Sequence, residues 1–192
     1  MKARLLEGVP ADLIILSGAM IDELIAAGHV VAGSRADLGR VGTGVAVWAG
    51  TPLPDVKTTD ALRGNLLAAS KIVCPDPGTA TAGKIVMSAL ERMGIAEQAR
   101  PKLQFFPNGY AAMSWLAGSQ GTLEVGITQN TEIKANKDVT YVGLLPDELQ
   151  MKTTYSAGLC ARAKDLDTAR LFLMRLTGPA NRTALAAAGY EF

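Results

Sequence analysis

The sequence is poor in cysteine, histidine and aromatic residues: it has 2 cysteines, 1 histidine and 5% aromatic residues. Cys74 and Cys160 stand apart, without a Cys-x-x-Cys pair or neighbouring histidines, so the usual spacings of zinc and dithiol sites are missing. The single histidine, His29, has no evident Ser, Cys or Asp partner in the sequence. We therefore expect two buried thiols, no metal site, no cofactor and no catalytic residue.

An excess of charge of one sign and a long hydrophobic run are also missing. The 19 basic and 18 acidic residues are spread along the chain and leave a net charge of +1. Nothing therefore indicates a nucleic-acid partner. Apolar runs such as "LIIL" are too short to span a bilayer, and the start "MKARLLEGVPAD" has no secretory hydrophobic region. Taken as complete, such a chain would be cytoplasmic.

The sequence does contain enough apolar residues for a globular core, 48% against 19% charged. Short strand-like runs alternate with amphipathic helical runs, which favours an α/β fold with mostly parallel sheets in one domain or two small lobes. The predicted strands are residues 12–17, 41–48, 71–74, 102–106, 122–128, 139–145 and 153–163. The predicted helices are residues 19–27, 59–67, 82–93 and 108–118, a short helix or turn at 129–136, and two tail helices divided at Gly178 and Pro179.

One stretch, "CPDPGTATAGKIV", has the spacing of a nucleotide-binding P-loop from Gly78 to Lys84. Ile85 follows the lysine, where a magnesium-binding hydroxyl is needed, so nucleotide hydrolysis is not supported. Glycines before a helix still let its free N–H groups approach an anion, and Thr79 and Thr81 add hydroxyl donors. The alternative is that Thr81 only caps its helix and Gly78 only makes the turn.

A second strand-to-helix turn repeats this arrangement in "FPNGYAAMSWLAG", where Asn108 and Gly109 open a helix. In open α/β sheets ligands bind just outside the carboxyl ends of the strands. Two such turns facing one crevice therefore predict a small-anion site that needs no magnesium.

The order of segments resembles the molybdate-binding type of periplasmic substrate-binding proteins of ABC transporters, the type 2 class of two-lobed binders. "PADLIILSGAMIDELIAAG" and "RVGTGVAVWAG" look like parts of the first lobe and its crossing strand, and "CPDPGTATAGKIVMSALERMGI" looks like the proline-rich loop and ligand-facing helix. The resemblance implies a discontinuous lobe I of residues 1–48 and 153–192, and a lobe II of residues 49–152. The two lobes would close on a small anion.

The resemblance also implies the ligand-binding residues. Carried over position by position, they are Ser17, Thr81, Ala82, Gly83, Asn108, Gly109, Gln129 and Tyr155, to which the loop itself adds Thr79. Each has a plainer alternative: Ser17 caps the next helix, Gln129 lies on the surface, and Tyr155 belongs to the core. The implied setting is the periplasm, with a membrane permease as partner and a molybdate-like oxyanion or small carboxylate as ligand.

The chain departs from this family at its start, where the opening strand, helix and strand are missing. We therefore expect a truncated first lobe. Either the start codon is assigned too late, or the chain is a fragment, or a partner supplies the lost sheet edge. An exposed edge would favour self-association.

Two rival functions stay open beside a binder that is not an enzyme. One is an isomerase of a small polycarboxylate such as aconitate, which needs a base; Glu132 and Lys84 are the candidates. The other is a ligand-sensing domain of a transcription factor or receptor.

Overall fold

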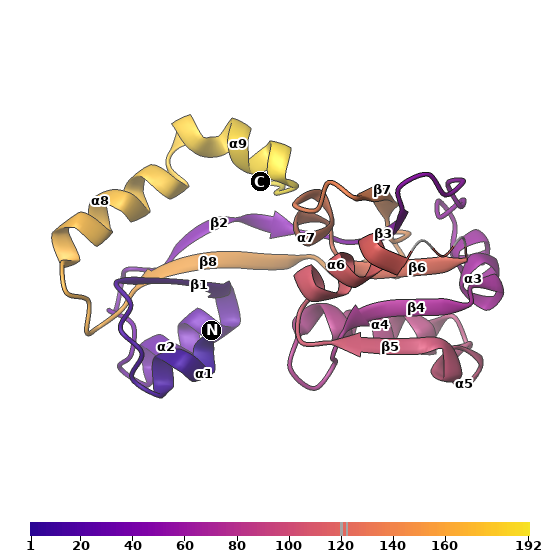
Figure 1. Ribbon diagram of the computed structural model, residues 1–192. Coiled ribbons are helices and arrows are strands. Elements are labelled where there is room, and N and C mark those ends of the chain that lie inside the picture. The colour runs from indigo at the N-terminus through magenta and orange to yellow at the C-terminus, as the bar shows by residue number, and fades with distance from the viewer. Residues whose placement is uncertain (120, 122) are drawn as a thin grey trace. The chain divides into compact units, whose positions relative to one another are not determined.

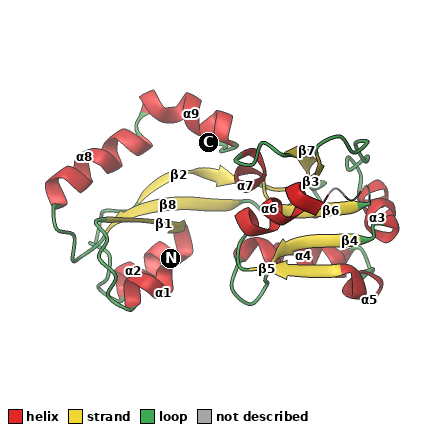
Figure 2. Ribbon diagram, viewed as in Figure 1, coloured by secondary structure: helices red, strands yellow, loops and turns green. Residues whose placement is uncertain are grey.

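The computed structural model describes residues 1–119, 121 and 123–192 (Figure 1). It divides the chain into two compact units. Unit 1 consists of Met1–Val41 and Thr153–Phe192, and unit 2 is the continuous segment Gly42–Lys152. Each unit has its own sheet and its own helices, drawn by type in Figure 2.

Unit 1 is built on a three-stranded sheet in the order β1-β8-β2. Its strands are β1 (Leu13–Ser17), β2 (Ala36–Val41) and β8 (Thr153–Leu159). Its helices are α1 (Lys2–Leu6), α2 (Gly18–Ala26), α8 (Leu166–Thr177) and α9 (Arg182–Ala188), with a 3-10 turn at Pro179–Asn181. The proline starts that turn, so the predicted division of the tail into two helices at Gly178 and Pro179 is confirmed.

Alternate residues of the unit 1 strands pack on opposite faces, as a pleated sheet requires. Ile14 of β1 packs with Ile21 and Leu24 of α2 in one cluster. On the other face, Ala157 and Leu159 of β8 pack against α8 and α9. Figure 1 shows these helices on the two sides of the sheet.

Unit 2 contains a five-stranded mixed sheet in the order β5-β4-β6-β3-β7. Its strands are β3 (Thr43–Trp48), β4 (Lys71–Pro75), β5 (Leu103–Phe106), β6 (Glu124–Gln129) and β7 (Val139–Leu144). Its helices are α3 (Thr59–Ala68), α4 (Thr81–Arg92), α5 (Ala96–Ala99), α6 (Gly109–Ser119) and α7 (Asn130–Lys134), with a 3-10 turn at Arg100–Lys102. The α/β class is therefore confirmed.

The expectation of mostly parallel sheets is wrong. Strand β4 runs parallel to β5 and β6, but β3 is antiparallel to β6 and β7. Strand β8 is antiparallel to both of its neighbours, β1 and β2. The reason is that β8 comes from the far end of the chain and enters between β1 and β2 in the opposite direction, which a pattern of apolar runs does not record.

Two apolar clusters cover the faces of the unit 2 sheet. Helix α4 places Ile85, Val86 and Leu90 against Ile72 and Cys74 on one face. Helix α6 packs Met113 and Leu116 against the opposite face, with Val73. Ile85 is 4% exposed, so the residue that breaks the P-loop pattern is part of the core.

Both cysteines are buried free thiols, as predicted. Burial, with the charge of Asp76 adding to it, raises the pKa of the Cys74 thiol to about 12. Burial and the charge of Asp12 also raise the pKa of Cys160. Neither thiol is ionised at neutral pH, in agreement with a structural role.

Two predicted element boundaries differ from the structure. The predicted strand 41–48 is divided at Gly42, since Val41 ends β2 in unit 1 and Thr43 starts β3 in unit 2. The boundary of the first unit therefore precedes β3, which pairs with β6 and β7, whereas the predicted lobe I ended at residue 48. The predicted strand 122–128 begins at Glu124 in the structure, and Thr122 lies outside the described residues.

Candidate functional site

The carboxyl ends of the three parallel strands form one edge of the unit 2 sheet. Because β5, β4 and β6 are direct neighbours, the backbones at this edge are about 5 Å apart from strand to strand. The loop after β4 is tied to the end of β5, because the Asp76 N–H donates to the Phe106 carbonyl oxygen at 2.7 Å. Three helices, α4, α6 and α7, begin directly after these strands. We refer to this end of the sheet, where β5, β4 and β6 finish and the three helices begin, as the strand edge.

The loop before α4 is shaped by Asp76. Its carboxylate Oδ1 accepts from the Gly78 N–H at 2.7 Å, and its carbonyl oxygen accepts from the Ala80 N–H at 2.9 Å. Gly78 therefore belongs to an Asx-type turn. Gly83 meets the same loop from the helix, where a Cβ would lie 2.7 Å from the Pro77 nitrogen and would overlap the Pro75 carbonyl oxygen. Both glycines of the apparent P-loop pattern are thus explained by local packing.

The amino terminus of α4 has no side-chain cap. Its N-cap residue is Ala80, in an extended conformation, and no side chain accepts a hydrogen bond there. Thr81 is the first helical residue, so the alternative in which Thr81 caps the helix is wrong. The first-turn N–H groups of Thr81, Ala82 and Gly83 point away from the helix without intrahelical acceptors. A 12-residue helix that presents such N–H groups favours an anion there.

The amino terminus of α6 is, by contrast, satisfied by the protein itself. The side chain of Asn108 accepts from the Ala111 N–H at 2.8 Å, an ordinary N-cap. A Cβ at Gly109 would overlap Glu132 Oε2 and Thr128 Oγ1. The Thr128 hydroxyl donates to Glu132 Oε2 at 2.5 Å. The second predicted turn therefore faces a carboxylate of the chain.

Gln129 lies at the same edge, as the last residue of β6 and the N-cap residue of α7. It is 3% exposed, so the alternative that places it on the surface is wrong. Its Cα partner on β3 is Thr43. The Thr43 hydroxyl is fully buried, and among the described residues it has no hydrogen-bond partner. Thr43 is a polar residue at the strand edge that the sequence pattern did not reveal.

The remaining two predicted residues, Ser17 and Tyr155, belong to unit 1. They are direct Cα partners across β1 and β8, so their side chains point to the same face of the sheet. Ser17 occupies the N-cap position of α2 but makes no side-chain cap bond, and Tyr155 is half-buried. The structure therefore brings these two residues together, and it brings the other predicted residues together at the strand edge of unit 2.

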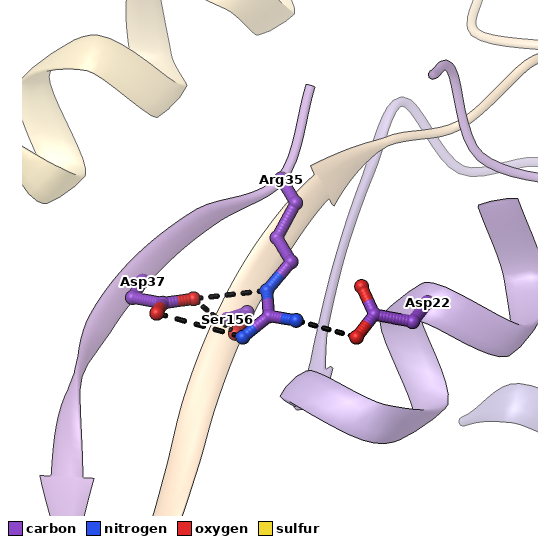
Figure 3. A network of polar contacts seen from close by, with 4 residues as sticks. All are labelled: Asp22, Arg35, Asp37 and Ser156. Atoms are coloured by element: carbon purple, nitrogen blue, oxygen red, sulfur yellow. Dashed lines mark hydrogen bonds and ion pairs between the residues drawn. The ribbon is translucent and has the colours of Figure 1, made fainter. Parts of the chain in front are cut away.

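An arginine that the sequence reasoning missed, Arg35, lies beside Gly18 at the start of α2. Figure 3 shows the Arg35 guanidinium held by two carboxylates: Nη1 donates to Asp22 at 2.5 Å and Nε donates to Asp37 at 3.0 Å. A Cβ at Gly18 would lie 2.6 Å from Nη2, so only a glycine at this position leaves room for the guanidinium at the start of α2. Because two acids surround one base, the group has a net charge of −1.

The hydrogen bonds of this network shift the pKa values of Arg35 and Asp37. Hydrogen bonds to Asp22 and then Asp37 raise the pKa of Arg35. Burial alone would raise the pKa of Asp37, but hydrogen bonds from Ser156, at 2.6 Å, and from Arg35 outweigh it and lower that pKa. Arg35 and Asp37 are therefore both charged over the whole physiological range of pH.

Metal clusters and membrane-spanning helices are both absent from the described residues. Within residues 1–119, 121 and 123–192, no three His, Cys, Asp or Glu side chains gather as metal ligands would. No described helix has the length and apolar character to cross a membrane.

Comparison with known proteins gives one family and several relatives. Residues 2–191 match the family described as "Bacterial extracellular solute-binding protein". A protein from Pseudomonas sp. named "Aconitate isomerase" is 29% identical over 190 residues, which are 98% of this chain and 70% of that protein.

Solved structures share the fold at lower identity. The periplasmic molybdate-binding protein of Azotobacter vinelandii superposes with a TM-score of 0.80 at 18% identity, covering 100% of this chain and 82% of that chain. The sulfate-binding protein of Mycobacterium tuberculosis superposes with a TM-score of 0.76 at 20% identity, covering 98% of this chain and 71% of that chain.

Proposed function

Because the chain belongs to the family of bacterial extracellular solute-binding proteins, we propose that it captures a small anion, an oxyanion or a small carboxylate, at the strand edge of unit 2. In this proposal it delivers the anion to the membrane permease of an ABC transporter, in the periplasm. Capture by closure of two lobes, which the resemblance implied, stays a prediction.

The observation that carries the proposal is the uncapped start of α4. The helix follows a parallel strand, its N-cap residue is Ala80, and among the described residues no side-chain cap bond is made to its first turn. A bound anion would accept hydrogen bonds from these groups and would also be stabilised by the helix dipole. The proposed ligand contacts here are the backbone of Thr81, Ala82 and Gly83, with the exposed hydroxyl of Thr79 at the rim.

The names of the relatives support two ligand classes. Solved structures with the same fold are named for molybdate and sulfate, whereas the 29% identical protein is named for aconitate, a small polycarboxylate. Both classes offer oxygen acceptors of negative charge, which is what free helix N–H groups bind. The α4 terminus therefore accounts for an anion and does not choose between them.

The proposal is tested by giving α4 a cap. Ala80→Asp places a carboxylate where an N-cap residue normally accepts from the first turn, so the side chain would compete with a bound anion and repel it. Isothermal titration calorimetry with molybdate, sulfate, phosphate and trans-aconitate should show at least about tenfold weaker binding for the variant, equivalent to about 1.4 kcal/mol.

The same change should stabilise the fold, because a good N-cap contributes about 1 kcal/mol. Thermal unfolding then separates lost binding from lost structure. Ala80→Asn is the matched control, since it caps the helix without adding charge and should weaken binding less than the aspartate. Unchanged affinity in Ala80→Asp, or no binding of any of the four anions by the unaltered protein, would contradict the proposal.

A second candidate function is isomerisation of a small polycarboxylate, and the specific observation favouring it is the 29% identity to a protein named aconitate isomerase. Such a reaction moves a double bond: a base takes a proton from the saturated carbon, and a proton returns to the carbon at the other end of the allylic system. Glu132 is the candidate base, because its carboxylate is fixed at the strand edge by Thr128.

This candidate is tested by incubating the protein with trans-aconitate in deuterated buffer and following the proton NMR spectrum. An isomerase produces cis-aconitate and incorporates deuterium, and Glu132→Gln should abolish both while the fold is retained. If calorimetry shows that trans-aconitate binds but the NMR spectrum shows no conversion, the protein is a binder and not an isomerase.

A further inference from the structure

The two helix starts at the strand edge differ in what they offer a ligand. Helix α4 starts without a side-chain cap, whereas α6 starts with its Asn108 cap in place and with a carboxylate beside it. Both lie at the carboxyl ends of neighbouring strands, β4 and β5. This edge therefore offers donors at the start of α4 and an acceptor beside the start of α6.

The acceptor is Glu132, whose position is set by Thr128 and by the space that Gly109 leaves. Its Oε2 receives the Thr128 hydroxyl at 2.5 Å. Gly109 leaves open the space that a side chain would fill, so the carboxylate reaches the start of α6. Continuing the β4–β6 register beyond Val73 and Gly126 places Thr128 level with Pro75, which ends β4 just before the α4 loop. Glu132 is half-buried, so the residue is not sealed from solvent.

The charge of Glu132 has no basic partner among the described residues. In the part of the chain that the structure describes, Glu132 takes part in no ion pair. Lys134 of the same helix lies over the ring of Tyr141, 5.6 Å from its centroid, and Lys84 is exposed. Asp76 adds a second carboxylate to the edge, with Oδ1 engaged by Gly78. A fully ionised anion would therefore meet uncompensated negative charge beside the α6 start.

From this arrangement we propose that Glu132 determines the ligand class of the site. The inference rests on the proposed anion capture and deepens it: the ligand presents negative oxygens to α4 and a hydrogen-bond donor to Glu132. The class that fits is a small anion carrying its own donor, such as a hydroxy acid or a hydrogen phosphate. Fully ionised tetrahedral oxyanions, such as sulfate and molybdate, have only acceptors and are disfavoured.

Two ligand pairs test this by calorimetry at pH 7.5. Phosphate and sulfate have the same shape, but hydrogen phosphate carries a proton; malate and succinate differ by one hydroxyl. The unaltered protein should bind the first member of at least one pair at least tenfold more tightly than the second. In Glu132→Gln an amide replaces the carboxylate and presents a donor, so the preference should fall to less than threefold and sulfate should bind more tightly than before.

Two further variants keep the test decisive. Glu97→Gln removes a carboxylate from α5, where Glu97 pairs with Arg100 on the exposed surface, and it should keep the preference of the unaltered protein. Glu132→Ala removes the charge without adding a donor; if Glu132→Gln fails to fold, the loss of preference is read from this variant. Because a carboxylate beside a helix start generally stabilises the helix, each variant is first compared by thermal unfolding.

The outcomes separate this inference from the proposed function. Binding of these anions with equal ratios in Glu132→Gln and the unaltered protein overturns the role of Glu132 and leaves anion capture intact. A preference for sulfate over phosphate in the unaltered protein also overturns it. Failure of every probe to bind either protein removes the anion site itself, and the inference with it.

Discussion

At the scale of single residues, the structure sorts polar side chains that look alike in the sequence. Asn108 and Ser17 both occupy N-cap positions, but only Asn108 makes the cap hydrogen bond. Thr79 is exposed on its loop, whereas Thr128 is buried and holds Glu132. Which hydroxyl reaches a ligand depends on what else lies within hydrogen-bond reach, and that is set by residues distant in the chain.

Asp37 gives a prediction about acid stability. Its pKa is lowered in the folded protein, so it stabilises the fold above the unfolded carboxyl value of about 3.9, and this contribution is lost as the pH falls through the lower folded value. Between about pH 5 and pH 3, the free energy of unfolding should therefore fall more steeply for the unaltered protein than for Asp37→Asn.

Urea unfolding followed by circular dichroism at several pH values measures this difference. The slopes should converge above about pH 6, where the carboxyl is ionised in both states. Identical slopes for the two proteins below pH 5 would show that Ser156 and Arg35 do not stabilise the ionised form. Because Asp37 is half exposed, solvent screening keeps the effect modest.

At the scale of elements, periodicity predicted most helices within a residue or two. Helices α2, α4 and α8 each bury an apolar face of the kind that a 3.6-residue period reveals. Strand β2 was missed because its sequence, "ADLGRV", alternates weakly and buries only Leu38 and Val41. It becomes a strand because β8 pairs with it, which is a contact between distant segments.

The first turn of α4 gives a matched pair of glycine variants. Gly83→Ala would drive a methyl group into the backbone of the Pro75–Asp76–Pro77 loop and should destabilise the protein by about 1–3 kcal/mol. Gly64→Ala, in the middle of α3, has nothing within 4 Å of the new methyl group and should stabilise it by about 0.5–1 kcal/mol.

Chemical unfolding of both variants measures the contrast. If Gly83→Ala were as stable as Gly64→Ala, the close packing of α4 on its own loop would not exist in solution. Anion binding by Gly83→Ala should also weaken, since displacing the loop moves the N–H groups of Thr81 and Ala82.

At the scale of the whole molecule, unit 1 leaves a sheet edge and apolar surface exposed. Strand β1 pairs with β8 alone among the described strands, whereas β2 also bridges to Glu191 through Arg40. Leu171, Phe172 and Met174 on α8 are 65%, 56% and 65% exposed. We propose that two copies of the chain associate through unit 1, since unpaired edges and clustered apolar side chains favour association.

Sedimentation velocity tests this proposal. The unaltered protein should sediment as a dimer at tens of micromolar, and the double variant Leu171→Glu with Met174→Glu should shift it to the monomer. Gln98→Glu, which adds negative charge to an exposed position of α5 in unit 2, should leave the dimer intact. A monomer at all concentrations would contradict the proposal.

The sequence by itself determined the α/β class, most elements, the buried thiols and the failure of the P-loop pattern at Ile85, because each depends on local composition and spacing. Only the tertiary structure decided the antiparallel course of β8, the place of Gly42 at the start of unit 2 and the carboxylate of Glu132 beside Gly109. These depend on which distant segments pair across a sheet. A hydrophobic pattern fixes the face that a residue takes, but not the neighbour it meets there.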